Sequence, residues 1–185
     1  MLFRSVLDRR QGIPISLSLV LIEVGKRLGL AVEGIGLPGH FIVGARFGDS
    51  QILLDPFNAG AVLTPEACEE LVGRALGRKV TLEPKRYAAV SARQFLARML
   101  ANLKGVYWQR EAWDRVVGVI DRLLVLDPKV AEEWRDRGLA WSNMGEVRRG
   151  LGDWERYLCE FPNAADHEAV KNHLRRARQK LARLN

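Results

Sequence analysis

The second half of the chain repeats itself at an offset of 34 residues. Pro128 and Pro162 stand at this offset, and each closes a helical run. The same offset pairs large or small side chains at further positions: Leu100 with Trp134, Lys104 with Gly138, Tyr107 with Trp141, Ile120 with Trp154, and Leu123 with Tyr157. A helix pair of this size cannot bury its apolar face alone, so neighbouring pairs stack around one core. From Ser91 onward we therefore expect helices and no strands.

These positions resemble the tetratricopeptide repeat (TPR) template, which has the same period. The match departs from the template at two places: the small residue of the second helix is Val116 in one repeat and Gly150 in the other, and Arg137 occupies a usually apolar position. After the second repeat, a helix over 167–184 carries one apolar stripe: Val170, Leu174, Ala177, Leu181 and Leu184. With its basic opposite face, this helix is typical of a solenoid cap. We predict two TPR repeats plus a C-terminal capping helix over residues 91–185.

The first half begins with an apolar helix. Pro14 fits the first helical position, where its missing N–H would have no partner, and Gly29 fits the stop. The helix predicted over 14–28 is apolar around most of its circumference, so we expect burial on more than one side. The apolar run 13–22 is about half the ~20 residues that a membrane-spanning helix needs. No cleavage site follows the run, so we predict a packed helix and neither a signal peptide nor a membrane span.

Three short extended runs follow this helix. They cover residues 31–37, 40–47 and 51–55. Between the last two runs, Gly48-Asp49-Ser50 is typical of a hairpin turn. Thr64 then caps a further helix that has Pro65 in its first position. We predict an α+β domain over residues 1–90, with one packed helix against an antiparallel sheet.

The composition places the chain among globular proteins. Of its 185 residues 48% are hydrophobic and the net charge is +7, which excludes wholesale disorder. Cys68 and Cys159 are far apart and lack metal-ligand spacing, so we expect no disulfide framework and a reducing, cytoplasmic location. The sequence shows no phosphate loop, dinucleotide fingerprint or metal cluster, so we expect no cofactor and no metal.

One pair of residues in the first half suggests chemistry. His40 starts the second extended run and Asp55 ends the third, so a hairpin turn near Gly48 brings both side chains to its open end, within a residue or two of register. A carboxylate fixes the tautomer of an imidazole and stabilises its cation, as general-base work requires. A structural ion pair that pins a hairpin has the same spacing, and such pairs are common. The spacing leaves both interpretations open.

Four motifs of the first half occur in a fixed order. They are Gly12-Ile13-Pro14-Ile15-Ser16-Leu17-Ser18, Arg27-Leu28-Gly29, Pro38-Gly39-His40-Phe41 and Asp55-Pro56-Phe57. Together they resemble the transglutaminase-like core, and with the TPR repeats they are similar to the bacterial SirB-type family. The resemblance implies a papain-like core in which a Cys at a helix N-terminus precedes a strand His and a strand Asp. It also implies a helical segment before the present start, and a regulatory role without a named substrate.

Only two of the three triad residues have a counterpart in this sequence. It matches the family histidine to His40 and the aspartate to Asp55, but Pro14 stands where the nucleophilic Cys belongs. Ser16 lies within a turn of that position, and a hydroxyl beside a His–Asp pair can be activated. Ser16 and Ser18 equally suit packing in an apolar helix, with their hydroxyls bonded to the preceding turn. Catalysis would require a close base and an oxyanion hole as well.

The other reactive side chains suit packing or solvent better than catalysis. Cys68 lies in the first turns of a helix, but the acidic residues beside it oppose a thiolate, so we expect a packing residue. Cys159 is expected in the core of the second TPR repeat. His167 and His173 share no helical face and are expected on the solvated surface.

Most of the net charge belongs to the last helix. Residues 171–185 contain no acid and six basic residues: Lys171, Arg175, Arg176, Arg178, Lys180 and Arg183. One net positive charge is thus left for the other 170 residues, which argues against a nucleic-acid-binding protein. The basic face suits either the solvated back of a TPR cap or a dock for an acidic partner. Trp134, Trp141 and Trp154 fall on TPR template positions, so we expect core packing before any base stacking.

These patterns favour a two-part protein that binds a protein or peptide through its TPR module. Its transglutaminase-like domain would lack a nucleophile, with His40 and Asp55 structural or part of a small-ligand pocket. The alternative is an acyl-transfer or hydrolase enzyme that uses Ser16 with His40 and Asp55. We expect no membrane partner, and the sequence names neither the binding partner nor the oligomeric state.

Overall fold

The computed structural model describes residues 3–48 and 50–183, which divide into two compact units. The first unit ends at Phe95 and the second begins at Leu96. Helix α4 (Ala92–Gln109) runs through this division, so the domain boundary that we place at residue 90 stays a prediction.

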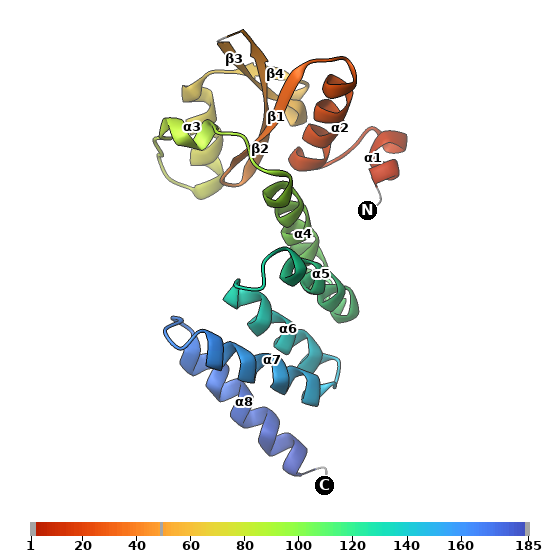
Figure 1. Ribbon diagram of the computed structural model, residues 1–185, viewed down its shortest axis with the longest axis vertical. Helices are drawn as coiled ribbons and strands as arrows, with labels where there is room; N and C mark the ends of the chain where they lie inside the picture. Colours follow the sequence, from red (N-terminus) through yellow and green to blue (C-terminus); the bar gives the residue numbers. More distant parts are fainter. Residues whose placement is uncertain (1–2, 49, 184–185) are drawn as a thin grey trace. The chain divides into compact units, whose positions relative to one another are not determined.

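An antiparallel sheet of four strands, in the order β1-β2-β3-β4, forms the centre of the first unit (Figure 1). Its strands are β1 (Ala31–Leu37), β2 (His40–Phe47), β3 (Ser50–Asp55) and β4 (Ala61–Leu63). The closing pair of the first hairpin is Leu37 opposite His40, and Phe47 opposite Ser50 closes the second. Asp49, which we place in the second turn, lies outside the described residues. The three predicted strands are confirmed; the short β4 was not predicted.

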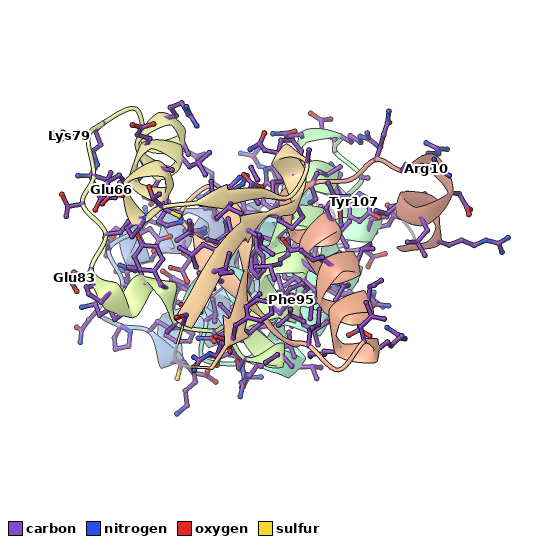
Figure 2. All side chains as sticks on the ribbon, turned by 90° about the horizontal axis from the view of Figure 1, so that it is seen from above. Arg10, Glu66, Lys79, Glu83, Phe95 and Tyr107 are labelled. Atoms are coloured by element: carbon purple, nitrogen blue, oxygen red, sulfur yellow. The ribbon has the colours of Figure 1, made fainter. Side chains whose placement is uncertain are left out.

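Helices cover both faces of this sheet, where the sequence predicted one packed helix. α2 (Pro14–Arg27) and α3 (Pro65–Leu76) lie on opposite sides of it (Figure 1). On the α2 face, Ile22 packs with three strand residues: Val32, Val43 and Ala45. On the α3 face, Cys68 and Val72 pack with four strand residues: Ile35, Leu37, Ile42 and Leu53. The alternation of each strand divides its side chains between the two cores. Phe95 closes the α2 side, where its ring meets Phe41 edge-on with centroids 5.0 Å apart (Figure 2).

Shorter elements surround this core. α1 (Phe3–Arg9) precedes α2, and the 3₁₀ helices η1 (Pro56–Asn58) and η2 (Pro84–Tyr87) follow β3 and α3. Thr64 caps α3 by accepting a hydrogen bond from the Ala67 N–H at 3.3 Å, as its sequence position predicts. These elements complete the α+β fold expected for the first half.

The second unit is all-helical, in agreement with the 34-residue repeat. After α4 come α5 (Trp113–Leu126), α6 (Ala131–Asn143), α7 (Val147–Glu160) and α8 (His167–Ala182) (Figure 1). Its core is built from the repeat positions, with Ile120, Trp154 and Tyr157 almost wholly buried. Val170, Leu174 and Ala177 of α8 complete this core, and Leu184 lies outside the described residues.

The crossing of α6 and α7 depends on glycine at position 138. A Cβ atom on Gly138 would lie 2.4 Å from Nε1 of Trp154, a side chain only 2% exposed. We expect Gly138→Ala to lower the free energy of unfolding by about 1–3 kcal/mol, because the packed indole cannot yield without strain. Gly152→Ala is the matched control, since nothing lies within 4 Å of its added Cβ. We expect the control to stabilise α7 by about 0.5–1 kcal/mol, measured by urea unfolding. Equal effects of the two substitutions would contradict this packing.

Candidate functional site

His40 and Asp55 meet at the open end of the β2–β3 hairpin. His40 is the first residue of β2 and Asp55 the last of β3, and antiparallel pairing brings them together. Nε2 of His40 lies 2.9 Å from Oδ2 of Asp55. The imidazole is 11% exposed and the carboxylate 0%. The structure thus pairs the two residues as the hairpin spacing predicts.

The Asp55 carboxylate makes three further hydrogen bonds. Its Oδ1 accepts from the backbone N–H groups of Phe57 at 3.0 Å and Asn58 at 3.4 Å, which makes Asp55 the N-cap of η1. Its Oδ2 accepts from Nδ2 of Asn58 at 2.6 Å. The Phe57 ring in turn lies edge-on to the imidazole, with centroids 6.1 Å apart. A buried carboxylate requires such partners, and here they tie the start of β2 to the turn after β3.

The start of α2 holds the residues that the triad comparison singles out. Pro14 is its first helical residue. The Ser16 hydroxyl accepts from the N–H of Ile13 at 3.0 Å and donates to the Ile13 carbonyl at 2.9 Å, and among the described residues it makes no other hydrogen bond. Ser18 is fully buried, and its hydroxyl donates to the Phe41 carbonyl at 3.4 Å. The hydrogen bonds therefore connect His40 with Asp55 and leave Ser16 outside the pair.

Cys68 lies inside the α3 core and is fully buried. Burial raises the pKa of its thiol from 9.0 to about 11, and the negative charges of Asp55 and Glu66 add to this rise. A thiol with this pKa is almost wholly protonated at neutral pH and is a poor nucleophile. The structure therefore gives Cys68 a packing position, as we expected from its acidic neighbours.

Our expectation that Cys159 lies in the core is wrong, because its residue is exposed. α7 turns Trp154 and Tyr157 into the core, and the helical period carries Cys159 away from that side. His173 also departs from the solvated position predicted for it. It is half-buried, and its ring stacks on Trp154 with centroids 5.6 Å apart.

The two thiols should therefore react very differently. In the native protein we expect iodoacetamide to alkylate Cys159 and to leave Cys68 unmodified. A rise of two units in pKa lowers the thiolate fraction about a hundredfold at neutral pH, and burial excludes the reagent as well. Peptide mass spectrometry with and without urea measures this difference. Native alkylation of both cysteines at similar rates would show that α3 opens easily.

A depression of about 540 Å³ lies beside α3. Glu66, Arg74 and Lys79 are among its lining residues, while His40 and Asp55 are not. Glu66 and Lys79 both lie along α3 and the loop that follows it (Figure 2). Within residues 3–48 and 50–183, no three His, Cys, Asp or Glu side chains are grouped as metal ligands.

Arg137 in the second unit forms a charge cluster that explains its departure from the TPR template. Its guanidinium holds both carboxylate oxygens of Asp153 at 2.7 and 2.8 Å, and it lies 2.6 Å from Oδ1 of Asp121. Asp153 is 7% exposed. The guanidinium also lies over the Trp134 ring, 4.8 Å from its centroid. An apolar position is thus replaced by a buried ion pair that joins α6 to α7.

A second chain of polar contacts links the repeats. Nζ of Lys104 lies 2.8 Å from Oε2 of Glu133 and 2.9 Å from Oδ2 of Asp136. The Arg135 guanidinium donates hydrogen bonds to both Asp136 and Asp166. The Tyr157 hydroxyl donates to the same Asp166. These hydrogen bonds lower the pKa of Asp166, while burial raises that of Tyr157 to about 12. This network was not predicted from the sequence, although Arg135-Asp136-Arg137 supplies its charge pattern.

The tryptophans of the second unit are mostly packed, as their repeat positions predict. Trp134 and Trp154 are 7% and 2% exposed, and Trp141 is half-buried in the same core. Trp108 and Trp113 meet edge-on, with ring centroids 5.3 Å apart.

The six basic residues of α8 and its C-cap are exposed: Lys171, Arg175, Arg176, Arg178, Lys180 and Arg183. The helices over residues 3–48 and 50–183 include none with the length and apolar character needed to cross a membrane.

Comparison with known proteins identifies both halves. Residues 1–101 match the family model of the transglutaminase-like superfamily, and residues 103–175 match that of the tetratricopeptide repeat. A UPF0162 protein of Xylella fastidiosa is 38% identical over 91% of this chain and 61% of its own length. A UPF0162 protein of Vibrio cholerae is 29% identical over 91% of this chain and 63% of its own.

Another relative matches about half of the chain. F-box only protein 21 of Mus musculus is 35% identical over 53% of this chain and 16% of its own length. The chain spans about three fifths of the length of the UPF0162 relatives. It belongs to the transglutaminase-like superfamily, with the SirB-type arrangement of a transglutaminase-like domain followed by TPR repeats.

Proposed function

We propose that this protein binds a protein or peptide through its TPR module and that its transglutaminase-like domain performs no acyl transfer. The observation that carries the proposal is the start of α2, where the family resemblance calls for a nucleophile. Pro14 has no nucleophilic atom there, and both hydrogen bonds of the nearby Ser16 hydroxyl are to Ile13. The buried Cys68, with its raised pKa, supplies no substitute.

In this proposal the His40–Asp55 pair is structural. Its carboxylate caps η1 and holds the imidazole, so it fixes the loop after β3 against the start of β2. A catalytic aspartate orients its histidine toward a nucleophile as well, and at the position where the family resemblance puts that nucleophile this chain has Pro14. The pair then resembles a triad because the fold retains it for stability.

In this proposal the TPR module is the part of the chain that binds the protein or peptide partner. Its helices α4 to α8 supply the binding surface, since repeat proteins use the surface of their stacked helices for polypeptide partners. The test is affinity capture from lysate with the intact protein, with its 91–185 piece and with its 1–90 piece, each checked for folding by circular dichroism. We expect the intact protein and the 91–185 piece to retain the same partner. Retention by the 1–90 piece alone would contradict the proposal.

The second candidate is a hydrolase in which Ser16 attacks and His40 is the base. It is favoured by the 2.9 Å contact that orients the imidazole on Asp55. It requires the Ser16 hydroxyl to leave Ile13 and to reach within about 3 Å of the imidazole. A fluorophosphonate adduct on Ser16 would support this candidate.

A further inference from the structure

The solvent side of α8 carries two basic flanks around a buried stripe. Val170, Leu174 and Ala177 pack into the TPR core. Because the helix has 3.6 residues per turn, residues spaced by four and three lie along one flank. Asn172 and Gln179 lie between the two flanks and are exposed. The solvent side is therefore polar as well as basic.

The first flank is neutralised in part by neighbouring acids. It consists of Lys171, Arg175 and Arg178. Nζ of Lys171 lies 3.3 Å from Oε1 of Glu168, and Nη2 of Arg178 lies 2.8 Å from Oε1 of Glu155 on α7. Two of its three charges thus have a partner within the protein.

The second flank, which we name the open basic stripe, consists of Arg176 and Lys180 of α8 and of Arg183, the C-cap residue that follows the helix. All three side chains are exposed. Within the part of the chain that the structure describes, none of them forms an ion pair or a hydrogen bond with a side chain. Seven residues of helix span about 10 Å, so three positive charges follow one another along two turns. Such a surface is complementary to a run of negative charge.

We propose that the open basic stripe of α8 docks an acidic segment of a partner polypeptide. The inference rests on the proposed binding function and names the chemistry of the partner. The exposed side of α8 offers ionic and polar contacts, so charge complementarity determines the occupant. An Asp/Glu-rich strand or helix fits a stripe this short.

The charge distribution favours a polypeptide over a nucleic acid. The 170 residues before α8's basic segment carry a net charge of only +1, whereas binding along a phosphate backbone draws on a broad excess of positive charge. Trp134 and Trp154 are packed in the core and offer no stacking platform for bases. A contact of three exposed charges gives modest affinity that falls with added salt.

The test is fluorescence anisotropy of a labelled oligoglutamate with the full chain at low and physiological salt. We expect R176E/K180E/R183E to weaken binding by more than about tenfold. The matched control, K171E/R175E/R178E, changes the net charge by the same amount on the other flank. We expect this control to weaken binding by less than about threefold, because its flank is already partly neutralised. Circular dichroism and thermal melting establish that both variants fold.

Three outcomes would contradict the proposed docking role of the open basic stripe. They are equal losses in both variants, the absence of oligoglutamate binding at low salt, and tighter binding of a single-stranded oligonucleotide at matched salt. If lysate capture by the 91–185 piece nevertheless persists in R176E/K180E/R183E, the proposed function stands and the stripe alone fails. If oligoglutamate binds the stripe but Ser16 accepts a fluorophosphonate, the proposed absence of acyl transfer fails and the stripe stands.

Discussion

Replacing Asp55 with alanine is expected to lower the free energy of unfolding of the first unit by about 1–3 kcal/mol. The substitution removes the acceptor of His40 and of the Phe57 and Asn58 N–H groups, at a position with no solvent access. Phe57 and Asn58 are exposed, so most of the cost comes from the His40 imidazole, which loses its partner at a site only 11% exposed. Hydrogen exchange of the β2 and β3 amides, measured by mass spectrometry, reports this loss.

The chain provides an internal control for this experiment. All five tryptophans lie between residues 108 and 154, so fluorescence follows the second unit alone. We expect the fluorescence transition to stay within about 0.5 kcal/mol of wild type. Glu70→Ala, which removes an exposed carboxylate on α3, should change little. A loss below about 1 kcal/mol for Asp55→Ala would contradict a structural role.

Replacing Arg137 with methionine is expected to destabilise the second unit by about 3–5 kcal/mol. The change leaves the Asp153 carboxylate, whose side chain is 9% exposed, without its counter-charge. Desolvated charge without a partner is costly, whereas an exposed pair contributes little. Urea unfolding followed by tryptophan fluorescence measures the loss, since the guanidinium lies over Trp134.

Asp121→Asn is the matched control for Arg137. Asp121 contacts the same guanidinium, but its side chain is 52% exposed, so we expect a loss of under about 1 kcal/mol. The double variant R137M/D153L should recover much of the stability, because an apolar pair of similar size replaces a buried ion pair at little cost. No recovery would mean that the arginine acts through contacts other than Asp153.

The hairpins could be predicted from sequence because local patterns determine them. Alternating side chains and glycine-containing turns gave β1 and β2 their observed bounds and placed His40 opposite the end of β3. β4 could not be found in the same way. It has three residues and follows a 3₁₀ turn, too short for any periodicity to register.

The charge networks of the second unit depend on tertiary packing. Arg137, Asp153 and Asp121 come from three helices, and only the stacking of α5, α6 and α7 brings them together. Comparison with the TPR template shows that Arg137 occupies a usually apolar position, but it does not predict which carboxylates bind the guanidinium. Cys159 is a different case, because the helical period that turns Trp154 and Tyr157 into the core already places it on the exposed side of α7.

The most direct test of the central claim, that this transglutaminase-like domain lacks a working nucleophile, is the intact mass of the native protein after incubation with a fluorophosphonate. We expect an unchanged mass, since the Ser16 hydroxyl is bonded to Ile13 and Pro14 cannot react. A stoichiometric adduct on Ser16 that disappears in His40→Ala would contradict the account and identify a serine hydrolase.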